Sequence, residues 1–200
     1  ANVVYEYAPG GSSLGEGQLV VPAPVPLYGG EVSIGVEAEA TGLRPWEDAC
    51  SSPCQLFMMA VHDRLMEQIA SGDYSPQMAE SLTPNDDYTV WTMVLRPGIT
   101  FSNGDALTAQ TIADMFPIQQ TGAVSAGPIG RSGLVGVEAV GDLTVEYTLS
   151  ATNVAFAGEL ALQGLGMVFH PGLAVSDPEG YTMNPIGTGA FILESRDIDN

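Results

Sequence analysis

The stretch YTVWTMVLRPGITFSNGDALTAQTIAD, residues 88–114, carries the clearest local structure signals in this chain. Over its first nine residues, large apolar side chains alternate with smaller ones, which is the two-residue period of a strand. The alternation therefore predicts a strand at 88–96 whose buried face consists of Trp91, Met93 and Leu95.

The second half of this stretch predicts two turns followed by a helix. Pro-Gly at 97–98 and Ser-Asn-Gly-Asp at 102–105 are typical of turns, because proline fixes one dihedral and glycine accepts left-handed backbone. Thr108 then occupies the position of a helix N-cap. We expect the helix at 109–116, ended by Pro117.

The same reasoning assigns elements to the rest of the chain. A turn at 85–87 predicts a hairpin of 81–84 with 88–96, and Gly141-Asp142 predicts a second hairpin over 134–149. In that hairpin's second strand, Val145, Tyr147 and Leu149 are expected to face inward. The remaining expectations are a strand at 31–37, helices at 55–69 and 155–162, a loop at 171–183, and a glycine turn with a short strand at 184–194.

Composition restricts the classes of partner. Acidic residues outnumber basic ones 24 to 5, the bases are all arginine, and the net charge is −19. Such a field repels nucleic acid and anionic membranes. It favours a cationic ligand, or it keeps a secreted protein soluble in a salty environment. The longest apolar run, at 160–169, is too short to span a membrane and is interrupted by Gln163.

The two cysteines, Cys50 and Cys54, have two readings. In CSSPC the spacing permits a small-loop disulfide, which suits an exported protein, and the alternative is two free thiols. A zinc site would need about four ligands, and only His62 and His170 could add imidazoles.

No catalytic constellation is expected. A hydrolase needs a nucleophile beside a histidine base, but His62 falls in a predicted helix and His170 in a Phe-His-Pro loop end. Gly-Thr-Gly at 187–189 lacks the spacing and the lysine of a phosphate loop. We interpret both histidines as surface or packing residues, and these glycines as positions of close backbone approach.

The segment LRPGITFSNGDALTAQTIADMF, at 95–116, resembles the signature of family 5 of the extracellular solute-binding proteins. The family usually has proline at the position of Ala106 and an acidic residue at that of Thr111. Three further segments match in the expected order: GGEVSIGVEAEATGLRPW at 29–46, VEAVGDLTVEYTLS at 137–150 and NPIGTGAFILES at 184–195.

The resemblance implies a mixed α/β fold of the type II periplasmic-binding-protein class, with a discontinuous first lobe and an inserted domain. Carried over by position, 1–28 form a flexible leader, 29–48 and 135–200 belong to the first lobe, and 49–134 form a small inserted α+β domain. The family's second lobe is expected to be absent from these 200 residues.

The resemblance also implies a function without bond chemistry. These proteins are receptors that capture peptides or nickel complexes outside the membrane, in the periplasm or at the cell surface, and deliver them to an ABC permease. No cofactor is implied. A nickel or metal-chelate receptor is the alternative within the family, and a secreted interaction module without a small ligand is the alternative outside it.

The family's ligand loop matches residues 46–51. The resemblance therefore implies ligand contacts from Trp46, Ala49, Cys50 and Ser51. Trp46 has a second reading as a packing residue at a domain junction. If Cys50 is bonded to Cys54, it stiffens the loop rather than touching the ligand.

Overall fold

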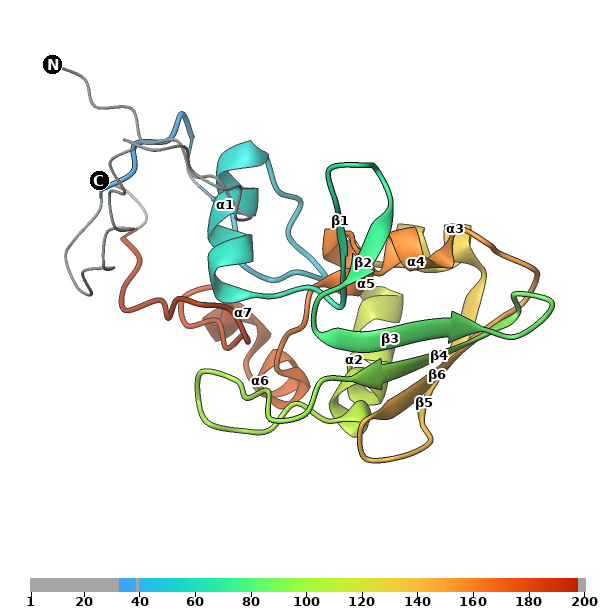
Figure 1. The fold of residues 1–200 in the computed structure, drawn as a ribbon. Coiled ribbons are helices and arrows are strands. Elements are labelled where there is room, and N and C mark those ends of the chain that lie inside the picture. Colours follow the sequence, from blue (N-terminus) through green and yellow to red (C-terminus); the bar gives the residue numbers. More distant parts are fainter. Residues whose placement is uncertain (1–32, 39, 198–200) are drawn as a thin grey trace, which may run out of the picture. The chain divides into compact units, whose positions relative to one another are not determined.

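The computed structural model describes residues 33–38 and 40–197 (Figure 1). The chain divides into residues 1–35 and residues 36–200, and the fold below is that of the second unit. The expected leader at 1–28 lies outside the described residues.

The described chain contains groups of short strands separated by helices. In order they are α1 (Ser52–Val61), β1 (Met66–Gln68), β2 (Tyr74–Pro76), β3 (Ala79–Pro84), β4 (Val90–Leu95), α2 (Ala109–Thr121), α3 (Ala126–Ser132), β5 (Leu134–Ala139), β6 (Thr144–Leu149), α4 (Phe156–Glu159), α5 (Gln163–Gly166), α6 (Pro171–Ser176) and α7 (Pro178–Tyr181). The expected mixed α/β class is confirmed.

An antiparallel sheet of order β3-β4-β6-β5 is the centre of the fold (Figure 1). Both predicted hairpins are present, and β4 pairs with β6, so that Trp91 lies opposite Tyr147 and Met93 opposite Val145. The predicted inward residues of both strands are buried. Together with the apolar side chains of α2, they form one core, whose buried members include Ile112.

The start of α2 confirms the predicted cap at Thr108. Its side chain accepts a hydrogen bond from the Thr111 amide at 3.2 Å, and the Thr111 hydroxyl accepts one from the Thr108 amide at 3.3 Å. Thr111 therefore closes the reciprocal capping box that an acidic residue would otherwise close. The predicted end at Pro117 is wrong, because the helix continues to Thr121 with the proline on its exposed side.

The predicted helix at 55–69 is wrong in its second half. The helix begins at Ser52 and ends at Val61, and β1 follows as one strand of a hairpin with β2. Leu65 and Met66 are buried as the pattern required, but Leu65 lies in a bend and Met66 begins β1. The apolar residues at 65, 66 and 69 are compatible with either a helix or a strand. The tertiary contacts select the non-helical conformation, because the amides of Leu65 and Met66 donate hydrogen bonds to the carbonyls of Gly166 and Leu160.

Three further expectations are wrong. Residues 33–37 form no strand, and no strand among the described residues pairs with them. The loop predicted at 171–183 contains α6 and α7, because Pro171 and Pro178 occupy the first turns, where proline is well tolerated. The short strand predicted within 184–194 does not form. The main chain of this segment instead donates hydrogen bonds to the last carbonyls of α1.

The segment at 187–191 closes the end of α1. Gly189 N donates to the Val61 carbonyl at 2.8 Å, and Phe191 N donates to the Ala60 carbonyl at 3.0 Å. A Cβ on Gly187 would lie 2.1 Å from the Val61 oxygen, so the backbone approaches too closely for a side chain. The interpretation of these glycines as positions of close approach is confirmed.

The predicted domain division stays a prediction. Its boundary at 134/135 falls within β5, after the first residue of that strand, and strands on both sides of it share the central sheet.

Candidate functional site

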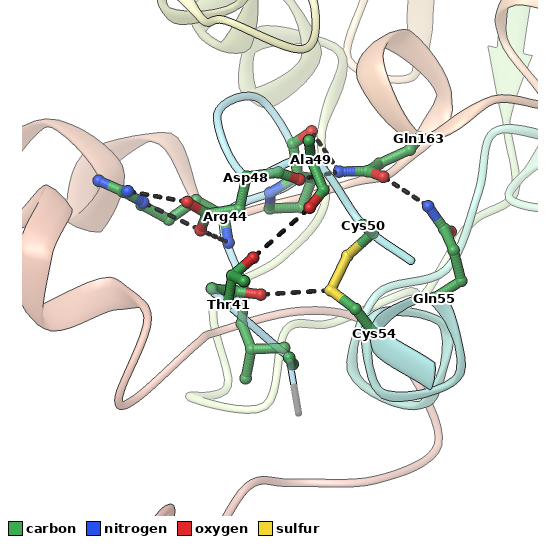
Figure 2. Close-up of a disulfide and its surroundings, with 12 residues drawn as sticks. Thr41, Arg44, Asp48, Ala49, Cys50, Cys54, Gln55 and Gln163 are labelled. Carbon is green, nitrogen blue, oxygen red and sulfur yellow. Dashed lines mark hydrogen bonds and ion pairs between the residues drawn. A yellow bond between two sulfur atoms is a disulfide. The ribbon is translucent and has the colours of Figure 1, made fainter. Parts of the chain in front are cut away.

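The loop that precedes α1 is folded around Arg44 and Asp48 (Figure 2). Arg44 Nη2 lies 2.8 Å from Asp48 Oδ1, and its backbone amide donates to Asp48 Oδ2 at 2.9 Å. The amides of Glu47 and Asp48 both donate to the Arg44 carbonyl, which closes a tight turn. Arg44 Nη1 also contacts Glu179 at 3.0 Å. These acidic partners raise the pKa of the guanidinium, chiefly through the Asp48 hydrogen bond.

Trp46 lies beneath this turn in the core. Its side chain is 5% exposed, and its ring centroid is 4.4 Å from that of Phe169 and 5.0 Å from that of Tyr181. Its carbonyl accepts hydrogen bonds from the amides of Val124 and Ser125 at 3.0 and 3.2 Å. In this conformation Trp46 packs, and its contact with a ligand stays a prediction.

The other three predicted ligand residues lie at the surface. Ala49 and Ser51 are exposed and Cys50 is half-buried, directly before the first turn of α1. The structure joins Cys50 to Cys54 in a disulfide whose Cα atoms are 5.1 Å apart, and Cys54 is buried (Figure 2). The disulfide thus ties the loop to the helix that follows it.

Two glutamines that the sequence reasoning did not single out hold the loop from the other side. Gln163 Nε2 donates to the Asp48 carbonyl at 2.7 Å and to the Pro45 carbonyl at 3.2 Å, while its Oε1 accepts from Gln55 Nε2 at 2.5 Å (Figure 2). The sequence does mark Gln163 as unusual, because it is a polar residue within the apolar run at 160–169. The side chain is half-buried, and its hydrogen bonds to two loop carbonyls make it an anchor of the loop.

The described residues also include a shallow hollow away from this loop. It has a volume of about 550 Å³ and is lined by Thr108, Gln110, Ala139, Val140, Gly141 and Asp142, which come from the start of α2 and the β5–β6 turn. None of the predicted ligand residues lines it. Within the part of the chain that the structure describes, no group of three or more His, Cys, Asp or Glu side chains could hold a metal ion, and no helix is long and apolar enough to cross a bilayer.

Both histidines take part in packing or capping, although the buried Nε2 of His62 has no hydrogen-bond partner among the described residues. His62 is buried, its ring stacks on Tyr181, and its Nδ1 lies 3.2 Å from the Val168 carbonyl oxygen. Burial lowers the pKa of His62 to about 4, so the ring is neutral at pH 7. His170 Nε2 lies 2.9 Å from Asp105, and its Nδ1 accepts the Leu173 amide at the start of α6.

The family of this chain follows from its sequence match over most of the described fold. Residues 73–200 match the family model of bacterial extracellular solute-binding proteins, family 5 middle, and the chain belongs to this family. It is a family of solute-binding proteins, in agreement with the expectation that no enzymatic activity is present.

Curated relatives come from Escherichia coli strain K12. The nickel-binding periplasmic protein is 29% identical over 154 residues, which are 74% of this chain and 29% of that protein. The probable D,D-dipeptide-binding periplasmic protein DdpA is 28% identical over 131 residues, 62% of this chain and 25% of that protein. This chain therefore spans less than a third of the length of these relatives.

Solved structures show the same fold in part. Haemophilus influenzae OppA, in complex with the peptide RPPGFSPFR, has a TM-score of 0.71 at 20% identity, over 82% of this chain and 35% of that one. The substrate-binding protein CtaP of Listeria monocytogenes has a TM-score of 0.69 at 22% identity, over 81% and 33%. The fold of this chain therefore matches about a third of each of these two structures.

Proposed function

We propose that this chain is a portion of an ABC importer's substrate receptor that captures peptides outside the membrane and delivers them to the permease. Family membership supports the receptor class. The peptide bound to the similar Haemophilus influenzae OppA supports the ligand class, as does the similarity to the probable D,D-dipeptide-binding protein of Escherichia coli. The periplasm or the outer cell surface is the corresponding location.

The observation that carries the proposal is the fixed ligand-side loop. Arg44–Asp48 pairing, the disulfide and Gln163 hold its backbone from three sides, while Ala49 and Ser51 remain exposed. A peptide receptor needs such preorganised backbone, because an extended ligand is bound largely through main-chain hydrogen bonds. We assign Ala49 and Ser51 to the ligand-facing edge; Cys50, bonded to Cys54, stiffens the loop, and Trp46 supports it from within.

The mechanism is closure of two lobes around the ligand, followed by docking of the closed form on the permease. In this proposal residues 29–48 and 135–200 contribute to the first lobe, 49–134 to its insert, and the opposing lobe lies outside these 200 residues. An isolated lobe cannot enclose a ligand, and enclosure supplies most of the buried area in such sites.

Isothermal titration with a defined di- to pentapeptide mixture tests the proposal. The 200-residue chain is expected to give no binding in the micromolar range. Sub-micromolar binding by the chain alone contradicts the two-lobe proposal.

A paired substitution tests the loop in a receptor that contains this chain together with an opposing lobe. Ser51→Trp is expected to weaken peptide binding at least about tenfold, since it adds bulk at the ligand edge. Ser176→Trp is the control, because Ser176 is also exposed but lies on α6. Equal affinities of the two variants would remove the loop from the binding site.

A metal-chelate ligand is the second candidate, since the 29% identical relative is a nickel-binding protein. The described residues contain no group of side chains that could hold a metal ion. In this second proposal the receptor therefore binds a metal whose ligands are supplied by a small-molecule chelator. The same titration with Ni²⁺–histidine complex separates the two candidates. A receptor that gives no thermal shift with either ligand would instead fit an interaction module.

A further inference from the structure

Arg64 differs from the other arginines in its surroundings. Arg44 and Arg131 are paired with carboxylates, and Arg196 donates to backbone carbonyls. Among the described residues, Arg64 has no ion pair, and its side-chain contact is from Nη2 to the Met59 sulfur at 3.1 Å. Its Nε is buried and has no hydrogen-bond partner.

This arrangement is electrostatically incomplete. Desolvation lowers the pKa of the half-buried guanidinium, with no neighbouring acid to oppose it. Arginine nevertheless stays charged in proteins, so the cation occupies a site that disfavours it. Partly buried charges are normally paired, and the missing partner of a guanidinium is an anion. The chain has 24 acidic residues, yet none of those described forms an ion pair with Arg64. The guanidinium can therefore accept an anion that binds from outside.

The base of the Arg64 side chain is held in place. Its amide donates to Gln77 Oε1 at 3.1 Å, and its carbonyl accepts the Met78 amide at 3.0 Å. The Met78 carbonyl in turn accepts a hydrogen bond from the Arg96 amide at 3.0 Å. The main chains of two of the five arginines are therefore both bonded to that of Met78.

The geometry points to a carboxylate subsite at Arg64, with Met59 as its apolar wall. A guanidinium binds carboxylate and phosphate alike through paired N–H groups. The overall charge of −19 disfavours the doubly charged phosphate. Met59 is 47% exposed beside the guanidinium, which favours a carboxylate carried on an apolar body.

This subsite is separate from the proposed peptide loop. The loop precedes Ser52 and Arg64 follows Val61, so they lie beyond opposite ends of a ten-residue helix, about 15 Å long. The inference therefore stands whether or not the loop binds peptide.

The test uses NMR of the Arg64 Nε–H group in the 200-residue chain during titration with hexanoate. A saturable shift of that signal supports the subsite. Hexanol and inorganic phosphate are the controls for the apolar and the anionic part. Shifts of equal size with hexanol, or saturation by phosphate at lower concentration than by hexanoate, would overturn the assignment.

A second probe distinguishes the source of the carboxylate. The blocked tripeptide Leu-Glu-Leu presents the same group as a protein side chain would. Saturation by hexanoate indicates a free small molecule, and saturation by the tripeptide alone indicates a docking protein. Neither probe shifting the Arg64 signal at millimolar concentration overturns the proposal.

Arg64→Met separates binding from folding. It removes an unpaired, partly desolvated charge, so the variant is expected to be at least as stable as the parent chain, with at least about tenfold weaker hexanoate binding. Arg131→Met is the matched control, because Arg131 is exposed and already paired with Glu159. Unchanged hexanoate binding in Arg64→Met would show that the guanidinium is not the receptor group.

Discussion

The central sheet and the loop at 44–51 are stabilised in different ways. In the sheet, β3 pairs with β4 and β5 pairs with β6 as two hairpins. The pairing of β4 with β6 joins these hairpins. The loop has no strand partner, and Gln163 holds it from a position 115 residues beyond Asp48. The sheet is therefore stabilised by burial of its alternating apolar side chains, whereas the loop is stabilised by hydrogen bonds of a few individual side chains. Substitutions should therefore reduce global stability in the first region and alter local order in the second.

The largest effect is expected from Leu95→Ala in β4. Leu95 is fully buried in the sheet core, so truncation leaves a cavity. We expect a loss of about 2 to 5 kcal/mol in the free energy of unfolding, measured by urea denaturation. Thr92→Ala, at a half-buried position on the opposite face, is expected to cost less than about 1 kcal/mol. Similar losses for both would contradict the one-sided burial of this sheet.

Lowering the pH tests the contact between the end of α1 and the segment after α5. His62 has a pKa of about 4 when folded and 6.5 in its ordinary state. The unfolded chain therefore binds a proton more readily, and stability is lost as the pH falls from about 6.5 to about 4. At about 1.4 kcal/mol per pH unit, the loss reaches about 3 kcal/mol. Urea denaturation across this range measures it.

The control for this effect is His62→Phe, which keeps a ring against Tyr181 but cannot titrate. The lowered pKa values of Asp87 and Asp105 act in the same direction, but only nearer the ordinary carboxyl range. The raised pKa of Asp63, caused by burial, acts in the opposite direction. Loss of stability between pH 6.5 and 5 that persists in His62→Phe would assign it to other groups.

The sheet could be predicted from sequence because its signals are local. Alternation over β4 and β6 places the large residues on one face, and turn residues at 85–87 and 141–142 specify the hairpins. Thr108 likewise marks the helix start through a contact only three residues long. None of these inferences needs knowledge of distant chain.

The remaining structure depends on contacts that sequence spacing does not reveal. Gln163 anchors the loop through Asp48 and Pro45, and no periodicity connects these positions. Leu65 and Met66 satisfied a helical pattern, although their buried places lie in a hairpin region. The position of the candidate loop came from family resemblance, and its ligand contacts stay predictions.

Reduction of the Cys50–Cys54 disulfide should produce a smaller and more local effect. The bridge closes a loop with a sequence separation of 4, and loop-closure entropy for so short a loop corresponds to about 2 kcal/mol. We expect a phosphine reductant to lower the urea midpoint and to increase proteolytic cleavage near Ala49, while the sheet amides keep their hydrogen-exchange protection.

The double variant Cys50→Ala/Cys54→Ala is the control for the reductant and should behave alike under both conditions. If reduction exposed the amides of β4 and β6 as much as those of the loop, the two regions would be one cooperative unit. The distinction drawn above would then not hold.

The smallest effect is expected at the α2 cap, where the comparison can be sharpened within a single turn. Thr108→Ala removes the side chain that accepts the Thr111 amide, and should cost about 1 kcal/mol. Thr111→Glu keeps the return bond in the form that the family usually has, and should be nearly neutral, because a carboxylate in the first turn also faces the positive end of the helix dipole. Thr111→Val removes that bond while keeping the shape of the side chain. If Thr111→Val unfolded at the same urea concentration as the parent chain, the reciprocal bond from the Thr108 amide to the Thr111 hydroxyl would contribute nothing to the start of this helix.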